Sequence, residues 1–242
     1  MDEKVYGINA VRESVESRRA KKLFASPKVL GHPVVVEAKK AKIPVVVAQD
    51  EALTKMIGKR YHQGLVALVE PFAYAKLDDV LAKAKDKEYP LLIMLDGIKD
   101  PHNLGAILRS CDAFGVDGVI IREKNEVPLN DTVARVSTGA IHYVDVVSVT
   151  NLSRTIEALK RNGYWVIGTD GSAAKSIYEE TYRYPVCLVV GSEGEGISRL
   201  VLEHCDITVK IPMVGHVNSL NASVSAGISI SAVRFVQYSN AK

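Results

Sequence analysis

Hydrophobic and polar positions over the first 70 residues follow two different periods. Where apolar residues recur every three or four positions, the pattern predicts helices, and short Val-rich runs predict strands. The expected helices cover residues 9–17, a segment ending near 42, and 50–57, and the expected strands cover 22–25, 44–47 and 65–69. These alternating elements predict a small α/β unit.

The next twenty residues break this pattern. Pro71 and Pro90 enclose the charge-rich stretch KLDDVLAKAKDKE, which predicts a linker carrying one short exposed helix. We therefore expect a first domain at 1–70, a linker at 71–90 and a second domain at 91–242.

Unbroken apolar runs recur after residue 90. They are LLIML at 91–95, GVII at 118–121, and the runs that begin at Tyr143, Tyr164, Val186 and Ile207. Such runs are typical of strands covered on both faces. Helical patterns alternate with them, including 152–162, which Gly163 ends as a left-handed cap. The second domain is therefore predicted to be α/β, with a mostly parallel sheet and helices on both of its faces.

The composition restricts the protein class. The chain has 242 residues, of which 47% are hydrophobic and 24% charged, which indicates a soluble globular protein of one or two domains. The charged start is not followed by an apolar run, and no stretch of about 18 apolar residues occurs, so we expect a cytoplasmic protein without a membrane span.

The cysteines do not indicate a metal site. Cys111, Cys187 and Cys205 lack C-x-x-C spacing, and each lies in or beside an apolar stretch. Buried thiols are therefore expected, with no disulfide and no bound metal.

The net charge of +3 is unevenly distributed. Residues 1–70 contain 13 Lys and Arg against 8 Asp and Glu, a surplus of 5, and the remaining 18 cations face 20 anions, a deficit of 2. A basic first domain could meet the phosphates of a nucleic acid. An ordinary solvated surface would explain the same imbalance.

In alternating α/β sheets, ligands bind beyond the carboxyl ends of the strands, so residues that follow the apolar runs are informative. After 91–95 comes DGIKDPHNLGAILRSCDAFG. We expect Asn103 to cap a helix that begins at Leu104, with Arg109 about two turns further on. Taken alone, a capping amide and a solvated arginine explain these residues better than a site does.

A glycine-rich loop, GSEGEGIS, follows the run at Val186. Its glycines permit close backbone approach to a ligand. The spacing is G-x-x-G-x-G, which differs from the dinucleotide-binding G-x-G-x-x-G, and the loop lacks the G-K-[ST] of a P-loop. Because Glu193 and Glu195 would repel phosphate, a cationic or zwitterionic ligand suits the loop better.

The third informative segment is IPMVGHVNSLNASVSAG at 211–227. A strand end and a bend are followed by a helix of small residues, which Asn218 or Ser219 can cap. Asn221 and Ser223 add amide and hydroxyl groups. Taken alone, this segment is again better explained as a packed helix.

The three segments together are far more specific. N-L-G-x-x-x-R-S, G-S-E-G-x-G and I-P-M…N-S-L-N-A-S, in this order, resemble the three motifs of the SpoU (TrmH-like) family of RNA ribose 2′-O-methyltransferases in the SPOUT superfamily. The resemblance covers 91–238. YGINAVRE near the start and HQG at 62–64 are similar to the substrate-binding domain of the RlmB subgroup, which methylates a guanosine of 23S ribosomal RNA.

The resemblance implies a trefoil knot near the C-terminus, S-adenosyl-L-methionine as cofactor, and a homodimer. An unusually apolar final helix at 220–238 also favours a homodimer. Arg109 would stabilise the ribose alkoxide and hold an RNA phosphate. The implied catalytic residues are Asn103, Arg109, Glu193, Ser219 and Asn221, and the implied cofactor-binding residues are Thr169, Gly191, Ile211, Met213 and Leu220.

Three other functions would explain part of this pattern. A tRNA 2′-O-methyltransferase would share every catalytic residue, and only the additional first domain favours ribosomal RNA. A non-catalytic RNA-binding protein of the same fold would not need an intact third segment, which this chain has. A dinucleotide-dependent dehydrogenase disagrees with the glycine spacing.

Overall fold

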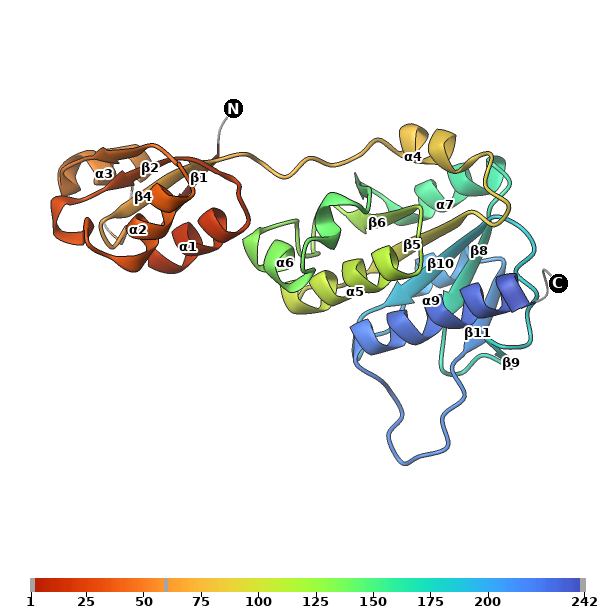
Figure 1. The fold of residues 1–242 in the computed structure, drawn as a ribbon. Coiled ribbons are helices and arrows are strands. Elements are labelled where there is room, and N and C mark those ends of the chain that lie inside the picture. Colours follow the sequence, from red (N-terminus) through yellow and green to blue (C-terminus); the bar gives the residue numbers. More distant parts are fainter. Residues whose placement is uncertain (1–2, 59–60, 240–242) are drawn as a thin grey trace. The chain divides into compact units, whose positions relative to one another are not determined.

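The computed structural model describes residues 3–58 and 61–239, and it divides into two compact units (Figure 1). The first unit is Met1–Ala73 with Asn130–Arg135, and the second is Tyr74–Leu129 with Val136–Lys242. Lys59 and Arg60, which contribute to the predicted positive surplus of the first domain, lie outside the described residues.

The first unit contains a four-stranded sheet in the order β1-β4-β2-β3. β4 is antiparallel to β1 and to β2, whereas β2 and β3 are parallel. Its elements are β1 (Glu3–Tyr6), α1 (Ile8–Glu16), β2 (Ala20–Ala25), the 3-10 turn η1 (Pro27–Val29), α2 (Pro33–Lys40), β3 (Val45–Val47), α3 (Asp50–Ile57) and β4 (Leu65–Val69). This is the small α/β unit expected from the sequence, extended by the strand β1.

Two sequence motifs of the first unit meet where β1 ends and β4 begins. The Ile8 amide, at the start of α1, donates to Gln63 Oε1 at 2.8 Å, and the Gly7 amide donates to the Leu65 carbonyl at 3.1 Å. His62 is buried and accepts the Gly64 amide on Nδ1 at 3.0 Å. These contacts join YGINAVRE to HQG.

The second unit is built on seven strands in the order β7-β6-β5-β10-β8-β11-β9, and every described pair of neighbours is parallel. This sheet confirms the predicted α/β fold. The strands are β5 (Leu91–Asp96), β6 (Gly118–Arg122), β7 (Val146–Val149), β8 (Trp165–Thr169), β9 (Lys175–Ser176), β10 (Val186–Gly191) and β11 (Ile207–Lys210).

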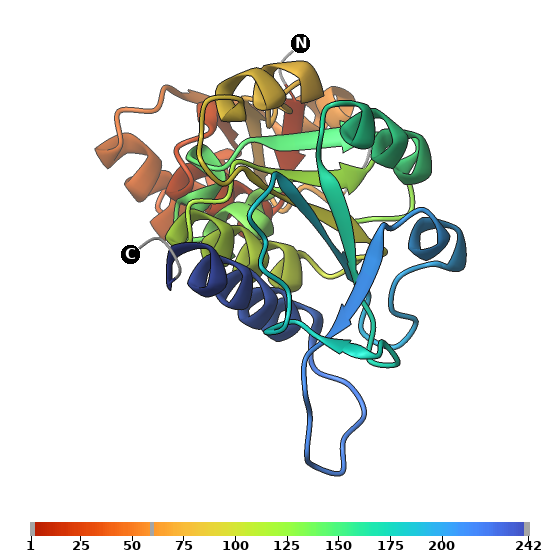
Figure 2. The same cartoon turned by 90° about the vertical axis from the view of Figure 1, so that its right-hand side faces the viewer.

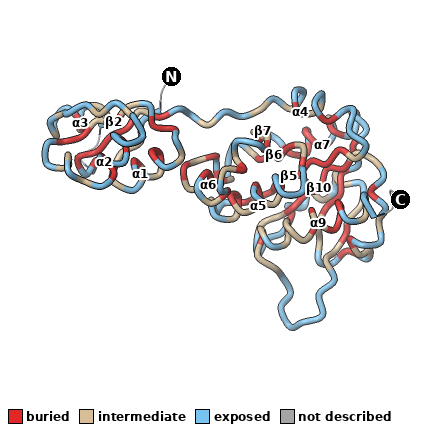
Figure 3. The backbone as a smooth tube through the Cα atoms, in the orientation of Figure 1, coloured by how far each residue is buried: buried red, intermediate tan, exposed pale blue. Residues whose placement is uncertain are grey.

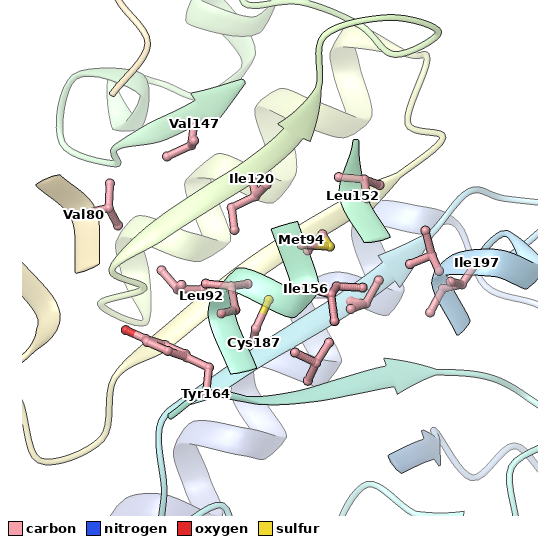
Figure 4. Close-up of a cluster of buried hydrophobic side chains, with 14 residues drawn as sticks. Val80, Leu92, Met94, Ile120, Val147, Leu152, Ile156, Tyr164, Cys187 and Ile197 are labelled. Atoms are coloured by element: carbon pink, nitrogen blue, oxygen red, sulfur yellow. The ribbon is translucent and has the colours of Figure 1, made fainter. Parts of the chain in front are cut away.

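Helices cover both faces of this sheet, and the strands are buried between them (Figures 2 and 3). On one face, side chains of α4, α7 and α8 form a core with alternate residues of the strands, such as Leu92 and Met94 (Figure 4). α5 packs against α9, which also contacts β10. The helices of the second unit are α4 (Leu77–Ala84), α5 (Pro101–Ala113), the 3-10 turn η2 (Ala140–His142), α7 (Leu152–Arg161), α8 (Arg199–Glu203) and α9 (Ala222–Ser239). All of α6 (Asp131–Val136) except its last residue lies in the segment Asn130–Arg135, which belongs to the first unit.

Two predicted helix starts were wrong. α5 begins at Pro101, and its cap is Asp100, whose carboxylate accepts the His102 amide at 2.9 Å. Asn103 therefore lies inside the first turn, because proline after an acidic residue is a stronger start signal. α9 begins at Ala222.

The cap of α9 also differs from the expectation. Asn221 Oδ1 accepts the amides of Ser223 at 2.9 Å and Val224 at 3.3 Å, so neither Asn218 nor Ser219 caps this helix. The helix predicted between Pro71 and Pro90 exists as α4, but it is not fully exposed, since Val80 and Ala84 are buried.

Arg234 fastens α9 to the end of α5. Its Nε donates to the Phe114 carbonyl at 3.0 Å, and its Nη2 donates to the Gly115 carbonyl at 2.5 Å. Nη1 donates to the Tyr89 carbonyl at 2.7 Å. Burial lowers the pKa of this guanidinium, whose described partners include no carboxylate. The cation therefore satisfies free carbonyls at the C-terminal end of α5.

The cysteines are free thiols, and two of the three are buried as predicted. Cys111 and Cys187 are buried, and burial raises the pKa of both, while burial raises the pKa of the partly buried Cys205 to about 12. Within residues 3–58 and 61–239, no helix has the length and apolar character that a membrane span requires. The same residues contain no group of three or more His, Cys, Asp or Glu side chains placed to hold a metal ion.

Candidate active site

Three side chains from distant motifs meet beside the carboxyl end of the parallel sheet of the second unit. Asn221 Nδ2 donates to Asn103 Oδ1 at 3.0 Å and to Glu193 Oε2 at 3.1 Å. Asn103 comes from the first turn of α5, Glu193 from the loop after β10, and Asn221 from the residue before α9. The structure thus unites one predicted catalytic residue from each of the three motifs, and we refer to them as the polar trio.

Asn221 has a second task in this arrangement. Its Oδ1 accepts the Ser223 hydroxyl at 2.6 Å as well as the two amides that begin α9. The carbonyl oxygen therefore caps the helix, while the amide nitrogen is left to bind Asn103 and Glu193. The start of α9 fixes the orientation in which Asn221 meets the other two residues.

Arg109 is not brought to the polar trio. It lies six residues after Asn103 on α5, which corresponds to about 9 Å along the helix and a different side of it. Its side chain is exposed and forms no hydrogen bond or ion pair with any described residue. The guanidinium is therefore free to reach a bound molecule.

A cavity adjoins the polar trio. It has an empty volume of about 630 Å³, which includes space open to solvent. All five predicted cofactor-binding residues line it, and so does Ser219, from the predicted catalytic set. The lining consists of Thr169, Asp170, Gly171, Val190, Gly191, Ser192, Gly196, Ile211, Met213, Asn218, Ser219, Leu220, Ala222 and Ser225.

The glycines of the loop after β10 are required by its backbone path. The amides and carbonyls of Ser192 and Gly196 exchange two hydrogen bonds of 3.0 Å, so the loop folds back on itself. A Cβ on Gly191 would lie 2.1 Å from the Gly196 carbonyl carbon. Gly194 and Gly196 have φ angles of 133° and 67°, which favour glycine. The loop therefore presents Glu193 at a tight turn and gives the cavity a backbone wall.

Two carboxylates that no sequence motif marks, the buried Asp96 and the partly buried Glu126, support the loops at this edge of the sheet. Asp96, at the end of β5, accepts the Ser198 amide at 2.8 Å and hydroxyl at 2.5 Å, and Arg122 Nη2 at 2.7 Å. Glu126 accepts the amides of Gly97 at 2.8 Å and Arg122 at 2.9 Å, and burial raises its pKa. The position of Asp96 directly after an apolar run was the one available signal.

Comparisons with known proteins agree with this geometry. Residues 90–231 match the model of the SpoU rRNA Methylase family, and residues 4–75 match a domain described as RNA 2'-O ribose methyltransferase substrate binding. A Staphylococcus epidermidis protein named as a TrmH family tRNA/rRNA methyltransferase is 45% identical over 233 residues, covering 95% of this chain and 94% of that protein.

Solved structures share the fold. The SpoU methyltransferase AviRb from Streptomyces viridochromogenes, in complex with AdoMet, superposes with a TM-score of 0.68 at 23% identity and covers 99% of this chain and 92% of its own. The TrmH/SpoU tRNA modifying enzyme of A. aeolicus superposes with a TM-score of 0.58 at 28% identity, over 68% of this chain and 86% of its own. On the strength of its family match and its relatives, this chain belongs to the SpoU rRNA methylase family.

Proposed function

We propose that this protein transfers a methyl group from S-adenosyl-L-methionine to a ribose 2′-hydroxyl of structured RNA. The observation that carries the proposal is the direct continuity of the polar trio with the cavity. Ser192 lines the cavity and precedes Glu193, and Leu220 and Ala222 line it on either side of Asn221. A donor in the cavity and a hydroxyl at the trio would therefore be neighbours.

The cavity suits this methyl donor. Its walls are mainly backbone and apolar groups, with Asp170 as its single acidic side chain among the lining residues, and this agrees with a ligand of positive or mixed charge. Thr169, Gly191, Ile211, Met213 and Leu220 would hold the adenosine and methionine parts. When bound, the cofactor supplies a methyl group already activated by a sulfonium centre.

The protein must then orient and deprotonate the ribose hydroxyl. Asn103, Glu193, Asn221 and Ser219 would fix the ribose by hydrogen bonds. A guanidinium stays protonated in proteins and is a poor base. Arg109 therefore acts as a mobile cation that holds an RNA phosphate and stabilises the developing alkoxide, while that phosphate takes the proton as the oxygen gains the methyl group.

A guanosine of 23S ribosomal RNA is the proposed target, because the chain carries the substrate-binding domain in addition to the catalytic one. Transfer RNA is the alternative, since the relatives' names include it. Mass spectrometry of ribose-methylated nucleotides from cells lacking the protein tests both. Loss of one methylated guanosine in 23S RNA is expected, and a loss confined to tRNA would identify tRNA as the substrate instead. No change in any RNA would contradict the activity.

We further propose a homodimer that covers the apolar surface of α9. Ile230 and Val233 are buried within the chain, but Val224, Phe235 and Tyr238 are exposed. A hollow lined by Phe114, Phe235 and Tyr238, among others, lies along this surface. Light scattering should give twice the chain mass of 26.3 kDa, and a monomer mass at micromolar concentration would refute the dimer.

Three further expectations remain proposals. We expect cofactor binding without a metal, and calorimetry should give the same affinity with and without a chelator. We expect a trefoil knot in the C-terminal chain. When the chain is stretched by mechanical unfolding, its contour length should be shorter than that of an unknotted chain with the same number of residues. A cytoplasmic location would be refuted by recovery of the protein in a membrane fraction.

A further inference from the structure

One end of the first unit carries a group of exposed cations. Arg18 follows the end of α1, Lys39 and Lys40 form the last turn of α2, and Lys42 lies two residues beyond it. All four side chains are exposed. We call these four residues the basic end.

The topology brings these residues to the same end. β2 and β3 are parallel, and β1 and β2 are both antiparallel to β4, so β1, β2 and β3 run in one direction. α1 and α2 each return the chain to the start of the next strand, and the two helices contact each other. The Ile43 amide donates to the Ala38 carbonyl at 2.9 Å, which holds Lys42 against the end of α2.

These cations have no acidic partners among the described residues. Arg18, Lys39, Lys40 and Lys42 form no ion pair there, although Glu16 and Glu37 lie on the same helices. Some exposed lysines elsewhere are paired, for example Lys28 with Asp50 at 2.9 Å and Lys83 with Asp145 at 2.6 Å. The basic end is therefore a concentration of uncompensated positive charge.

Helix stabilisation accounts for only part of this group. Lys39 and Lys40 interact favourably with the negative end of the α2 dipole. Arg18 and Lys42 lie outside the helices, and their φ angles of 58° and 60° are uncommon for residues other than glycine. Their backbone amides donate to the carbonyls of Val15 at 3.1 Å and Lys39 at 3.0 Å, a role that does not require a charged side chain.

We propose that the basic end binds the phosphate backbone of the RNA substrate. The inference rests on the proposed function and adds the surface by which the first unit holds RNA. Four exposed cations on a domain that matches an RNA substrate-binding family form the electrostatic surface that phosphates require. Phosphate contacts of this kind give affinity and position without reading sequence.

The test is a charge-neutralised full-length protein, Lys39→Gln/Lys40→Gln/Lys42→Gln, measured for binding to a 23S RNA fragment between 50 and 200 mM salt. The matched control is Lys55→Gln/Lys76→Gln/Lys85→Gln, which removes three exposed and unpaired lysines that lie apart. Loss of three phosphate contacts should weaken binding by at least roughly tenfold and reduce the slope of log K against log salt by about 2. The control should change neither quantity to that extent.

Equal affinity and slope in the two triple variants would overturn the proposal, and so would a stronger effect on anionic phosphatidylserine vesicles than on RNA. Because Lys39 and Lys40 also stabilise α2, Arg18→Gln/Lys42→Gln provides a variant that leaves the helix intact. It should still lower the affinity and the slope. If the unmodified protein binds S-adenosyl-L-methionine but no RNA, the proposed RNA substrate is refuted. This outcome is distinct from failure of the basic-end proposal, in which the unmodified protein binds RNA and the variants bind it equally well.

Discussion

Asn221→Asp separates the two tasks of Asn221. An aspartate keeps the oxygen that caps α9, and its negative charge favours a helix N-terminus. It loses the amide nitrogen that donates to Asn103 at 3.0 Å and to Glu193 at 3.1 Å. A carboxylate would then face the carboxylate of Glu193 at about the same distance. We expect methyl transfer to be lost while folding is largely retained.

The magnitudes follow from this geometry. Two hydrogen bonds are lost, each contributing about 1 kcal/mol net, and two exposed carboxylates at contact distance repel by about 1 kcal/mol in water. The cap is unchanged, and the favourable interaction of the new charge with the dipole of α9 offsets up to about 1 kcal/mol of this. The free energy of unfolding should therefore fall by only about 1–2 kcal/mol. Turnover should fall by 100-fold or more, the scale of losing a positioned polar group in an active site.

Single-turnover methylation and urea unfolding measure the two effects separately. The control is Asn151→Asp, the same change at the cap of α7, where the side chain accepts the Arg154 amide at 2.9 Å. In Asn221→Asp, the paired carboxylates take up a proton at a higher pH than either would alone, so residual activity should rise as the pH is lowered. Normal turnover at neutral pH would refute the role of the polar trio.

Three other substitutions test further parts of the structure. Arg109→Ala should keep cofactor affinity by calorimetry and lower turnover about 100-fold. Near-normal turnover of Arg109→Lys would show that the guanidinium does not need to bind the phosphate and the alkoxide at the same time. Arg234→Ala should lower the free energy of unfolding by about 3 kcal/mol, because it leaves carbonyls at the end of α5 unpaired, and a loss below about 1 kcal/mol in urea unfolding would contradict this. Burial raises the pKa of Glu126, so this carboxyl is protonated at a higher pH in the folded chain than in the unfolded chain. The free energy of unfolding of the wild type, relative to that of Glu126→Gln, should therefore fall as the pH rises from about 4.5 towards 7. A difference that stays constant with pH would refute the shift.

Sequence periodicity predicted most of this fold. The long apolar runs marked the central strands of the second unit, because strands covered on both faces have no polar side. The start of α5 was misplaced by three residues, since Asn103 and Asp100 are both acceptable caps and only the following proline distinguishes them. Short elements such as β9 were not predicted, because two residues contain no period.

The candidate site was predicted as a set of residues, without its geometry. The resemblance to the three family motifs implied Asn103, Glu193 and Asn221 as catalytic residues, but only the folded structure shows that they touch. Asp96 and Glu126 were missed because a single carboxylate after a strand has no distinguishing pattern. Their importance arises from backbone amides far away in the chain, which no local sequence signal encodes.

The central place of β10 determines when the second unit can form during synthesis. β10 pairs with β5 on one side and β8 on the other, yet it follows both along the chain. Until residues 186–191 leave the ribosome, β5 is an open apolar edge of the strands β7, β6 and β5, and β8 has no neighbour, because β11 also follows β10. Such edges are prone to aggregation, and sheets built from distant strands fold slowly. A translational pause before β10 would therefore prolong the most vulnerable state of the nascent protein, whereas a pause after α9 would do little harm.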